Sequence, residues 1–502
     1  MADEVYDLLV IGGGINGAGI AADAATRGLT VLLADAADLA GATSSASSKL
    51  IHGGLRYLEH LEFRLVREAL AEREVLLAKA PHIVRPLRFV LPEVAGMRSG
   101  LLMRAGLFFY DHLSARKSLG TSRALDLRND PAGQPLAPGL TRGFSYWDCA
   151  VDDARLVVLN AIAAREAGAE VRTRAPVTAL TIENGLWVAT LGDGSRRRVA
   201  RAVVNAAGPW VADVAQLASG PQQRTSVAVR LVKGSHIVVP RIAGADDAYT
   251  FQNSDGRVVF ALPFEDRFTL IGTTEENLSG DPRGIEPSPD EENYLLDAAA
   301  RFFRIPPTRA DICWSFAGVR PLDDDADSRQ NASAVSRDYR LELDGTHGAP
   351  ILHVIGGKIT TYRKLAEAAM KTLQSYFPHM ASGTTAATRP LPGGDLGGQS
   401  FDDWFVGFAH EHADFDRAFL RRLARRHGTR ARSIIEGARS ETDLGDDFGA
   451  GLTAREVSYL KSEEWAQTAD DVLWRRTKIG LHLAPDERAH AADRIQACLD
   501  KS

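Results

Sequence analysis

Two hydrophobic runs near the start of the chain flank a stretch with helical periodicity. Residues 6–12, YDLLVIG, predict a buried strand, and residues 30–34, TVLLA, predict a second one. Between them, GGINGAG and IAADAATRG predict a glycine-rich turn and a helix that ends at Gly28. A strand, a helix and a second strand in this order predict a βαβ unit.

Apolar positions further along the chain predict several more elements. Apolar residues at helical spacing over 62–80 predict a helix that Pro81 would end. Residues 227–272 are β-rich in pattern, and residues 351–373 repeat the order of strand, glycine turn and helix. Other strands are predicted at 85–91, 171–182, 186–191 and 200–205. After RPLPGGDLGG, 389–398, which has the composition of a linker, the pattern is helical throughout.

Composition and charge are those of a globular protein, and 502 residues imply two or three domains. The net charge of -6 argues against nucleic acid as a partner, because affinity for phosphate backbones needs a basic face. The three cysteines have no close spacing, so we expect no metal site, no disulfide framework and a reducing, cytoplasmic location. We expect no signal peptide, and no run reaches the roughly 20 apolar residues of a spanning helix.

The glycine turn of the first unit carries a nucleotide-binding pattern. Gly12, Gly14 and Gly17 form G-x-G-x-x-G between strand and helix, which lets the backbone approach a pyrophosphate at the helix N-terminus. An acidic residue should follow the second strand to hold a ribose, and Asp35 stands there. We therefore predict dinucleotide binding, although the pattern alone does not choose between FAD and NAD.

Two further stretches have the small residues that close approach to a ligand requires. AVVNAAGPW, 202–210, is an apolar strand that ends in small residues, like the second signature of flavoproteins with two dinucleotide motifs. SSASSKLIHGGLRYL, 44–58, combines hydroxyls, glycines and three basic side chains. Such a segment suits an anionic ligand, and an ordinary surface loop is the alternative.

Several long motifs together resemble one flavoprotein family. They run from about residue 6 to DVLWRRTKIG near residue 480 and span nearly the whole chain. The motifs are DLLVIGGGINGAGIAADAATRGL, ATSSASSKLIHGGLRYLEH, VDDARLV, NAAGPW, LVKGSHIVVP, IGTTE, AGVRPL and GGKITTYRKLAE. In these stretches the chain resembles the FAD-dependent sn-glycerol-3-phosphate dehydrogenase family, in its aerobic respiratory branch. One departure is Asp35, where relatives often carry Glu, although the shorter side chain should still reach a ribose.

The resemblance implies an α/β fold class. It comprises a Rossmann-like FAD-binding domain of the two-dinucleotide-motif flavoprotein type, an inserted β-rich substrate domain and a C-terminal helical domain. We expect the FAD-binding domain at 1–80, 145–222 and 340–388, the substrate-binding domain at 81–144 and 223–339, and the helical domain at 389–502.

The resemblance also implies which residues hold FAD. Hydroxyls and amides of the serine run would contact the pyrophosphate and ribityl chain, and the helix after Gly357 would support negative charge at the flavin edge. The expected cofactor residues are Gly12, Gly14, Ile15, Asn16, Gly17, Asp35, Thr43, Ser44, Ser45, Ser47, Ser48, Lys49, Leu50, His52, Gly53, Gly54, Val177, Ala206, Ala207, Gly208, Gly357, Lys358, Ile359 and Thr360.

Glycerol 3-phosphate is the substrate that the resemblance implies, with dihydroxyacetone phosphate as product. Its doubly charged phosphate needs several cations, best supplied by arginine. The expected substrate-binding residues are Arg56, Tyr57, Arg320, Arg337 and Lys358. Transfer of a hydride from C2 to the flavin also requires a base for the hydroxyl proton, and His236, His52 and Lys358 are the candidates. Arg320 would stabilise the developing alkoxide.

Electrons must then leave the flavin, and the respiratory branch implies membrane quinone as acceptor. Residues 97–117, which mix Leu, Met and Phe with Arg98, Arg104, Arg116 and Lys117, suit either a lipid surface or an internal helix. The basic run 421–432 suits a solvated helix face or a lipid-facing patch. We expect peripheral attachment to the inner face of the cytoplasmic membrane and, from the resemblance only, a homodimer. The alternatives are an oxidase that uses oxygen and a catalytically idle flavoprotein scaffold.

Overall fold

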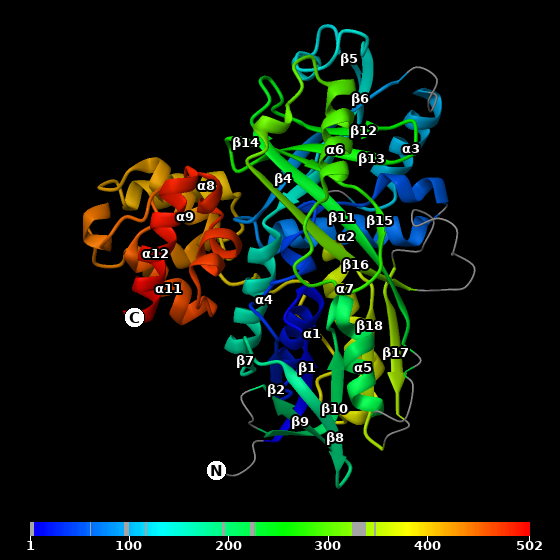
Figure 1. The fold of residues 1–502 in the computed structure, drawn as a ribbon, viewed down its shortest axis with the longest axis vertical. Helices are drawn as coiled ribbons and strands as arrows, with labels where there is room; N and C mark the ends of the chain where they lie inside the picture. The colour runs from blue at the N-terminus through cyan, green and yellow to red at the C-terminus, as the bar shows by residue number, and fades with distance from the viewer. Residues whose placement is uncertain are drawn as a thin grey trace.

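A computed structural model describes residues 5–60, 62–94, 100–115, 118–192, 196–220, 225, 227–323, 338–345 and 348–501. Within these residues the chain forms an eight-stranded sheet, a ten-stranded sheet and a group of helices near the C-terminus. In Figure 1 the first sheet lies at the bottom, the second lies at the top, and the C-terminal helices lie at the left. The C-terminal helices thus flank the region where the two sheets meet.

The first sheet is built on the predicted βαβ unit and has the central order β18-β10-β1-β2-β7, all parallel. Its strands are β1 (Val5–Ile11), β2 (Val31–Ala34), β7 (Glu170–Arg172), β8 (Val177–Glu183), β9 (Leu186–Leu191), β10 (Arg196–Asn205), β17 (Arg340–Asp344) and β18 (Ile351–Ile355). Parallel strands are buried on both faces, which explains the unbroken apolar runs in the sequence.

Helices cover both faces of this sheet. Alternate residues of β1 point in opposite directions, so Leu8 and Val10 join one core cluster while Leu9 and Ile11 join another. The first cluster includes α1 (Ile15–Thr26), α4 (Asp153–Glu166) and α7 (Tyr362–Leu373), and α5 (Val211–Ser219) packs on the other face. The carboxyl ends of the strands and the N-terminus of α1 therefore meet at one edge.

The second sheet is mostly antiparallel and lies above that edge in Figure 1. Its strands are β3 (Leu50–Ile51), β4 (Val84–Pro92), β5 (Arg123–Asp126), β6 (Arg142–Val151), β11 (Val229–Pro240), β12 (Ala248–Gln252), β13 (Val258–Phe264), β14 (Phe268–Gly272), β15 (Glu276–Leu278) and β16 (Trp314–Asp323). One face packs against α6 (Pro289–Phe302), and the other packs against α2 (Phe63–Lys79) and α3 (Gly100–His112).

The C-terminal part is helical, as its pattern predicts. It contains α8 (Phe401–Glu411), α9 (Arg417–His427), α10 (Ala431–Ile435), α11 (Ala454–Glu464), a π-helical segment (Asp471–Arg476) and α12 (Pro485–Lys501). Two apolar clusters of its own form its core.

Some predicted boundaries differ from the structure. The strand predicted at 171–182 is two strands, β7 and β8, because a turn that contains Arg174 at a φ of 53° and Pro176 separates them. Strands β3 and β6 pair within the second sheet, although residues 50–51 and 145–151 fall in the segments predicted for the FAD-binding domain. The sheet to which β3 and β6 belong is set by pairing between distant segments, which the sequence pattern of a single strand does not reveal.

Helix α3 contains most of the segment for which a lipid-facing or an internal position was predicted. Leu101, Leu102, Phe108 and Phe109 are each more than half exposed, so α3 is only partly internal. Of the basic residues predicted to flank this segment, Arg98, Arg116 and Lys117 lie outside the described residues. Among the described residues, no helix combines the length and the apolar character needed to cross a bilayer.

Candidate active site

Glycines bring the ends of β1 and β10 into close contact at the N-terminus of α1. Gly12 has a φ of 107°, and a Cβ atom there would lie 2.5 Å from the Ala206 carbonyl oxygen. A Cβ atom on Gly17 would overlap the Gly12 carbonyl oxygen. Helix α1 has no acidic residue in its first turn and no side chain of its own capping it; the Ser44 hydroxyl accepts a hydrogen bond from the Ile15 amide at 3.0 Å. The result is a cradle of backbone amides open to an anion.

Asp35 follows β2 directly, as predicted for the ribose-binding acid. Its carboxylate accepts hydrogen bonds from the Gly13 amide at 2.5 Å and the Ala37 amide at 2.7 Å. Burial raises the pKa of Asp35, and the two amides oppose that shift. The start of β8, where Val177 lies, is adjacent, because the Ala175 amide donates to the Asp35 carbonyl at 2.8 Å.

Distant segments of the chain converge on the cradle. The Asn16 side chain donates to the Gly356 carbonyl at 3.0 Å, which joins α1 to the glycine turn before α7. In that turn, the Thr360 hydroxyl accepts a hydrogen bond from the His52 amide at 3.3 Å. The predicted residues Gly357, Lys358, Ile359 and Thr360 therefore lie beside the predicted segment that contains His52, Gly53 and Gly54.

The serine run is held by bonds within the protein. Thr43 donates to the Val319 carbonyl at 2.6 Å, and the Ser45 hydroxyl donates to the Ala42 carbonyl at 3.2 Å. The Ser47 hydroxyl donates to Asp153 at 2.8 Å. These bonds fix the loop between β2 and β3 against β16 and the start of α4.

The Lys49 side chain is held by contacts within the protein, whereas the sequence predicts that it contacts the cofactor. Its ammonium group is buried and pairs with Asp153 at 2.9 Å, and it also donates to the Ser45 carbonyl at 2.8 Å. Burial lowers the pKa of Lys49, while the charge of Asp153 opposes that shift. Lys49 therefore holds the loop between β2 and β3 against α4, and its neighbour Leu50 is buried in β3. Asp153, which makes these bonds, was not predicted as a site residue.

Three side chains predicted to bind substrate gather near the cradle. The Lys358 ammonium lies 3.7 Å from the centre of the Tyr57 ring. Arg320, on β16, has only long contacts within the described residues, 3.5 Å to Glu275 and 3.5 Å to the Thr274 carbonyl. Burial lowers the pKa of Arg320 and the proximity of Tyr57 opposes that shift. Arg56 lies beside Tyr57 in a 3₁₀ segment and is half-buried, whereas Arg337 lies outside the described residues.

The two candidate histidines have different environments. His236 is buried, stacks on Phe316 with ring centres 5.0 Å apart, and lies 2.9 Å from the Ser48 hydroxyl. Burial, together with the charges of Lys49 and Arg320, lowers the pKa of His236 to about 3. His52 is half-buried and meets Phe260 edge-on with ring centres 6.3 Å apart.

A buried network beneath Gly53 escaped the sequence prediction. The Gly53 amide donates to the Tyr110 hydroxyl at 2.8 Å, and Tyr110 in turn donates to Asp148 at 2.7 Å. Arg73 pairs with the same carboxylate at 2.6 Å. A Cβ atom at Gly53 would lie 2.7 Å from the Tyr110 hydroxyl, so position 53 has no room for a side chain.

Comparisons with known proteins agree with this geometry. The FAD dependent oxidoreductase family matches residues 7–363, and the family described as the C-terminal domain of alpha-glycerophosphate oxidase matches residues 384–502. The chain is 53% identical over 498 residues to a glycerol-3-phosphate dehydrogenase of Pseudomonas aeruginosa, with 98% of this chain and 96% of that protein covered. The chain belongs to the FAD-dependent glycerol-3-phosphate dehydrogenase family. The family resemblance read from the motifs is thereby confirmed.

A second sequence relative and a solved structure support the same family. A D-erythritol 1-phosphate dehydrogenase of Brucella abortus is 49% identical over 491 residues, with 97% of each chain covered. The solved structure of a glycerol-3-phosphate dehydrogenase from Bacillus halodurans, in complex with FAD, has a TM-score of 0.74 at 26% identity and covers 100% of this chain and 96% of that one. The predicted fold class and FAD as the cofactor are confirmed for this flavoprotein.

The residues present in this flavoprotein fit FAD. Side chains at Gly12 and Gly17 would collide with backbone carbonyls and one at Gly14 would lie 3.2 Å from the Ser44 hydroxyl, so only glycines allow the tight turn that brings the backbone close to a pyrophosphate. The buried Asn16 Oδ1 atom has no hydrogen-bond partner among the described residues, which suits a ligand hydroxyl or amide at this point. The turn at Ala206, Ala207 and Gly208 closes the cradle from the β10 side.

The C-terminal part of the flavoprotein reaches back to the loop that follows Asp35. Arg476, which is fully buried, donates to both oxygens of Asp38 at 2.8 Å and 2.7 Å, and Arg475 donates to the same carboxylate at 2.7 Å. Nearby, Lys478 pairs with Asp152 at 2.5 Å. Asp152 directly precedes Asp153, the partner of Lys49. We call the contact of Asp38 with Arg475 and Arg476 the C-terminal clamp.

Proposed function

We propose that this flavoprotein oxidises sn-glycerol 3-phosphate at C2 to dihydroxyacetone phosphate. The observation that carries the proposal is the gathering of Tyr57, Arg320 and Lys358 from three distant segments next to the glycine cradle. Two or more cations beside a cofactor cradle suit a phosphate monoester that also has a hydroxyl to be oxidised. The chain is also similar over nearly its full length to proteins that carry this activity in their names.

Recognition of the phosphate falls to Arg320, Lys358 and Arg56. The contacts of Arg320 within the described residues are at the outer limit of hydrogen-bond length, so its guanidinium keeps most of its donors for a ligand. Lys358 lies over the Tyr57 ring, which holds the ammonium in place by a cation–π contact. When bound, FAD supplies the two-electron oxidation that these residues cannot perform.

The C2 hydroxyl proton goes to His52 in this proposal. With a pKa of about 3, His236 is a weak base near neutral pH, because burial disfavours its protonated form. Its stacking on Phe316 and its bond to Ser48 suit a residue that shapes the wall of the site. His52→Gln should lower the limiting rate and remove one ionisation from its pH profile, whereas His236→Gln should leave that ionisation in place.

Anaerobic titration with sn-glycerol 3-phosphate tests the activity directly. The flavin absorbance should bleach with one equivalent of substrate, and dihydroxyacetone phosphate should appear in equal amount. A flavin that stays oxidised would reject the proposal and favour an idle scaffold. D-Erythritol 1-phosphate, named for a relative at 49% identity, is the second candidate substrate. The ratio of kcat/KM for the two compounds decides between them, and a higher value for the erythritol ester would replace the proposed substrate.

The proposed electron acceptor is a membrane quinone, reached from the lipid surface through α3. Four large apolar side chains of α3 are exposed together, and Phe63 at the start of α2 is 6.3 Å from Phe109 between ring centres. Isolated exposed apolar residues are common, but a contiguous group suits an interface with lipid. The proposal places the protein at the inner face of the cytoplasmic membrane, and a homodimer stays a prediction.

Vesicle binding tests this surface. Replacing Leu101 and Phe109 by Asp should reduce cosedimentation with anionic vesicles at least tenfold and leave dye-linked activity unchanged. Ile305→Asp is the matched control, because Ile305 is 77% exposed and lies outside α3. Equal loss in the control would reject α3 as the membrane surface. Faster reoxidation of the flavin by oxygen than by a quinone analogue would favour the oxidase.

A further inference from the structure

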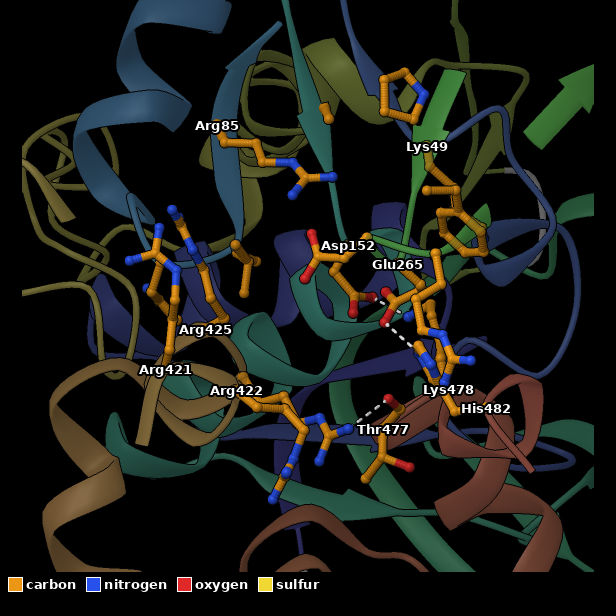
Figure 2. A pocket seen from close by; sticks show the side chains of 18 of the residues that line it. Lys49, Arg85, Asp152, Glu265, Arg421, Arg422, Arg425, Thr477, Lys478 and His482 are labelled. Atoms are coloured by element: carbon orange, nitrogen blue, oxygen red, sulfur yellow. Dashed lines mark hydrogen bonds and ion pairs between the residues drawn. The ribbon is translucent and has the colours of Figure 1, made fainter. Parts of the chain in front are cut away.

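A cleft of about 690 Å³ lies between the C-terminal helices and the second sheet, away from the cradle. One wall is α9, and the facing wall includes Arg85 of β4 and the turn between β13 and β14 (Figure 2). Among the described residues that line the cleft, Lys49 alone belongs to the predicted cofactor residues, and its ammonium is already paired with Asp153. The volume is that of a site for a small molecule.

Basic side chains dominate this cleft. Among its described lining residues, eight are Lys or Arg and five are Asp or Glu. Four of the arginines, Arg421, Arg422, Arg425 and Arg426, come from the basic run that the proposed function does not use, and on α9 they form two pairs of residues that are four positions apart. Like charges four residues apart weaken a helix, and within the described part of the chain only two of the four have a close acidic partner: Arg421 pairs with Asp402 at 2.8 Å and Arg426 with Glu456 at 3.1 Å.

Some of these cations lack a matched acidic partner among the described residues. Arg85 has no hydrogen-bond or ionic partner there, and Arg422 donates to the Gly451 carbonyl and not to an acid. Arg425 reaches Asp402 only at 3.7 Å and the Pro81 carbonyl at 3.5 Å. Burial lowers the pKa of Arg422 and of Arg425 to about 10, and neighbouring arginines, Arg426 and Arg421 respectively, contribute to the shift. Each guanidinium also lies over an aromatic ring, Arg425 at 3.5 Å from the centre of Phe401 and Arg422 at 5.0 Å from that of Phe419, but neither has a close carboxylate within the described ranges.

A buried histidine at the same cleft is also unsatisfied. His82 is 1% exposed and lines the cleft, and neither of its ring nitrogens has a hydrogen-bond partner among the described residues. Burial lowers the pKa of His82 to about 3, so the ring is neutral at physiological pH and has one donor and one acceptor to offer. Buried polar groups without partners are rare, and a ligand is one way to satisfy them.

We propose that this cleft binds a small phosphorylated anion, held by Arg85, Arg422 and Arg425 with His82 at its base. Figure 2 shows Arg85, on β4, above Arg425, on α9, and the charge of Arg85 contributes to the lowered pKa of Arg425, so the two side chains are close enough to contact one phosphate group. Arginine binds carboxylate and phosphate oxygens in bidentate geometry, and three arginines around one site favour a phosphate ester, which has more oxygens and more negative charge than a carboxylate. The site is independent of the proposed substrate site, because none of the residues that bind the substrate lines the cleft.

Binding of pyrophosphate to the holoenzyme tests the proposal by titration calorimetry at constant ionic strength. The Arg320→Ala background weakens anion binding at the proposed substrate site, so a saturable site of unchanged affinity in this background is the cleft. Adding Arg85→Gln and Arg425→Gln should weaken the saturable site in the cleft at least tenfold. Arg128→Gln is the matched control, because this exposed arginine pairs with Asp126 far from the cleft. Absence of a saturable site, or equal weakening by the control, would overturn the proposal.

Two further measurements distinguish a small anion in the cleft from a loss of folding and from a lipid headgroup. Arg85→Gln alone, whose side chain loses no partner among the described residues, should fold normally, keep kcat unchanged and weaken pyrophosphate binding. Vesicles that contain phosphatidylglycerol test a lipid headgroup as the source of the phosphate. If the two cleft substitutions reduce vesicle binding tenfold and free pyrophosphate does not bind, a lipid surface replaces the small anion and the proposal fails.

Discussion

Arg320 offers the sharpest test of the proposed site, because its guanidinium contributes more to the ligand than to the fold. Its side chain is 25% exposed, and its contacts with Glu275 and with the Thr274 carbonyl are both 3.5 Å long. Hydrogen bonds of that length are weak, so Arg320→Ala should leave the unfolding temperature nearly unchanged. Position 320 therefore allows the ligand's contribution to be measured without much loss of stability.

The expected effect follows from the strength of charge-assisted hydrogen bonds. Each contributes about 1.5 to 3 kcal/mol, so losing one lowers kcat/KM by about 10- to 150-fold. If Arg320 contacts only the phosphate, the loss falls on KM; if it also stabilises the developing alkoxide, kcat falls as well. Arg320→Lys keeps the charge but not the bidentate geometry and should give an intermediate value.

Anaerobic stopped-flow measurement of flavin bleaching against substrate concentration separates these effects. It gives the limiting rate and the half-saturating concentration independently of the electron acceptor. Arg128→Ala controls for a general change of charge, because Arg128 is exposed and pairs with Asp126 alone among the described residues. A value of kcat/KM for Arg320→Ala within threefold of the unsubstituted enzyme would refute the assignment of Arg320.

Three further predictions concern the cofactor and stability. Gly17→Ala should abolish FAD retention on gel filtration, because a Cβ atom there overlaps the Gly12 carbonyl; a variant that keeps its flavin would contradict the cradle. Asp38→Asn should cost about 3 kcal/mol, because the buried Arg476 loses its bidentate carboxylate and, among the described residues, keeps only a 3.9 Å ion pair with Glu464, and it should raise the FAD dissociation constant more than tenfold; an unchanged constant would disconnect the clamp from the cofactor. His82 stays neutral when folded but binds a proton when unfolded below pH 6.5, so stability should fall by up to about 1.4 kcal/mol per pH unit between pH 6.5 and about 3. His82→Gln should reduce the measured slope of the unfolding free energy against pH by about 1.4 kcal/mol per pH unit, which corresponds to one proton. An unchanged slope would show that His82 is not the group responsible.

The sequence predicts the cofactor end of the fold well because the signals there are local. The glycines at 12, 14 and 17 and the acid at 35 are fixed by one βαβ unit, so their relative positions follow from a strand and a helix of known geometry. The strand that contains His236 can also be predicted from a local pattern. The lowered pKa of His236, about 3, could not be predicted in this way, because it depends on burial and on the charges of Lys49 and Arg320.

Contacts between distant segments could not be predicted, because no local pattern in the sequence encodes them. Asp153 and Asp38 had no predicted role, although one pairs with Lys49 and the other with Arg476. Each is an ordinary acid in its own neighbourhood, and it gains a role only when a cation from far along the chain reaches it. The two-strand break at 173–176 and the assignment of β3 and β6 to the second sheet likewise depend on tertiary pairing.

The C-terminal clamp sets an order for the maturation of the protein. Asp38 is separated from Arg476 by 438 residues, and ribosomes add roughly 5 to 20 residues per second. A growing chain therefore spends roughly 20 to 90 seconds with the loop beside its cofactor cradle complete in sequence but lacking the cations that hold it. Only chains whose synthesis passes Arg476 can close that loop, because prematurely terminated products lack both arginines that pair with Asp38. The clamp thereby makes completion of the polypeptide a condition for a finished cofactor site.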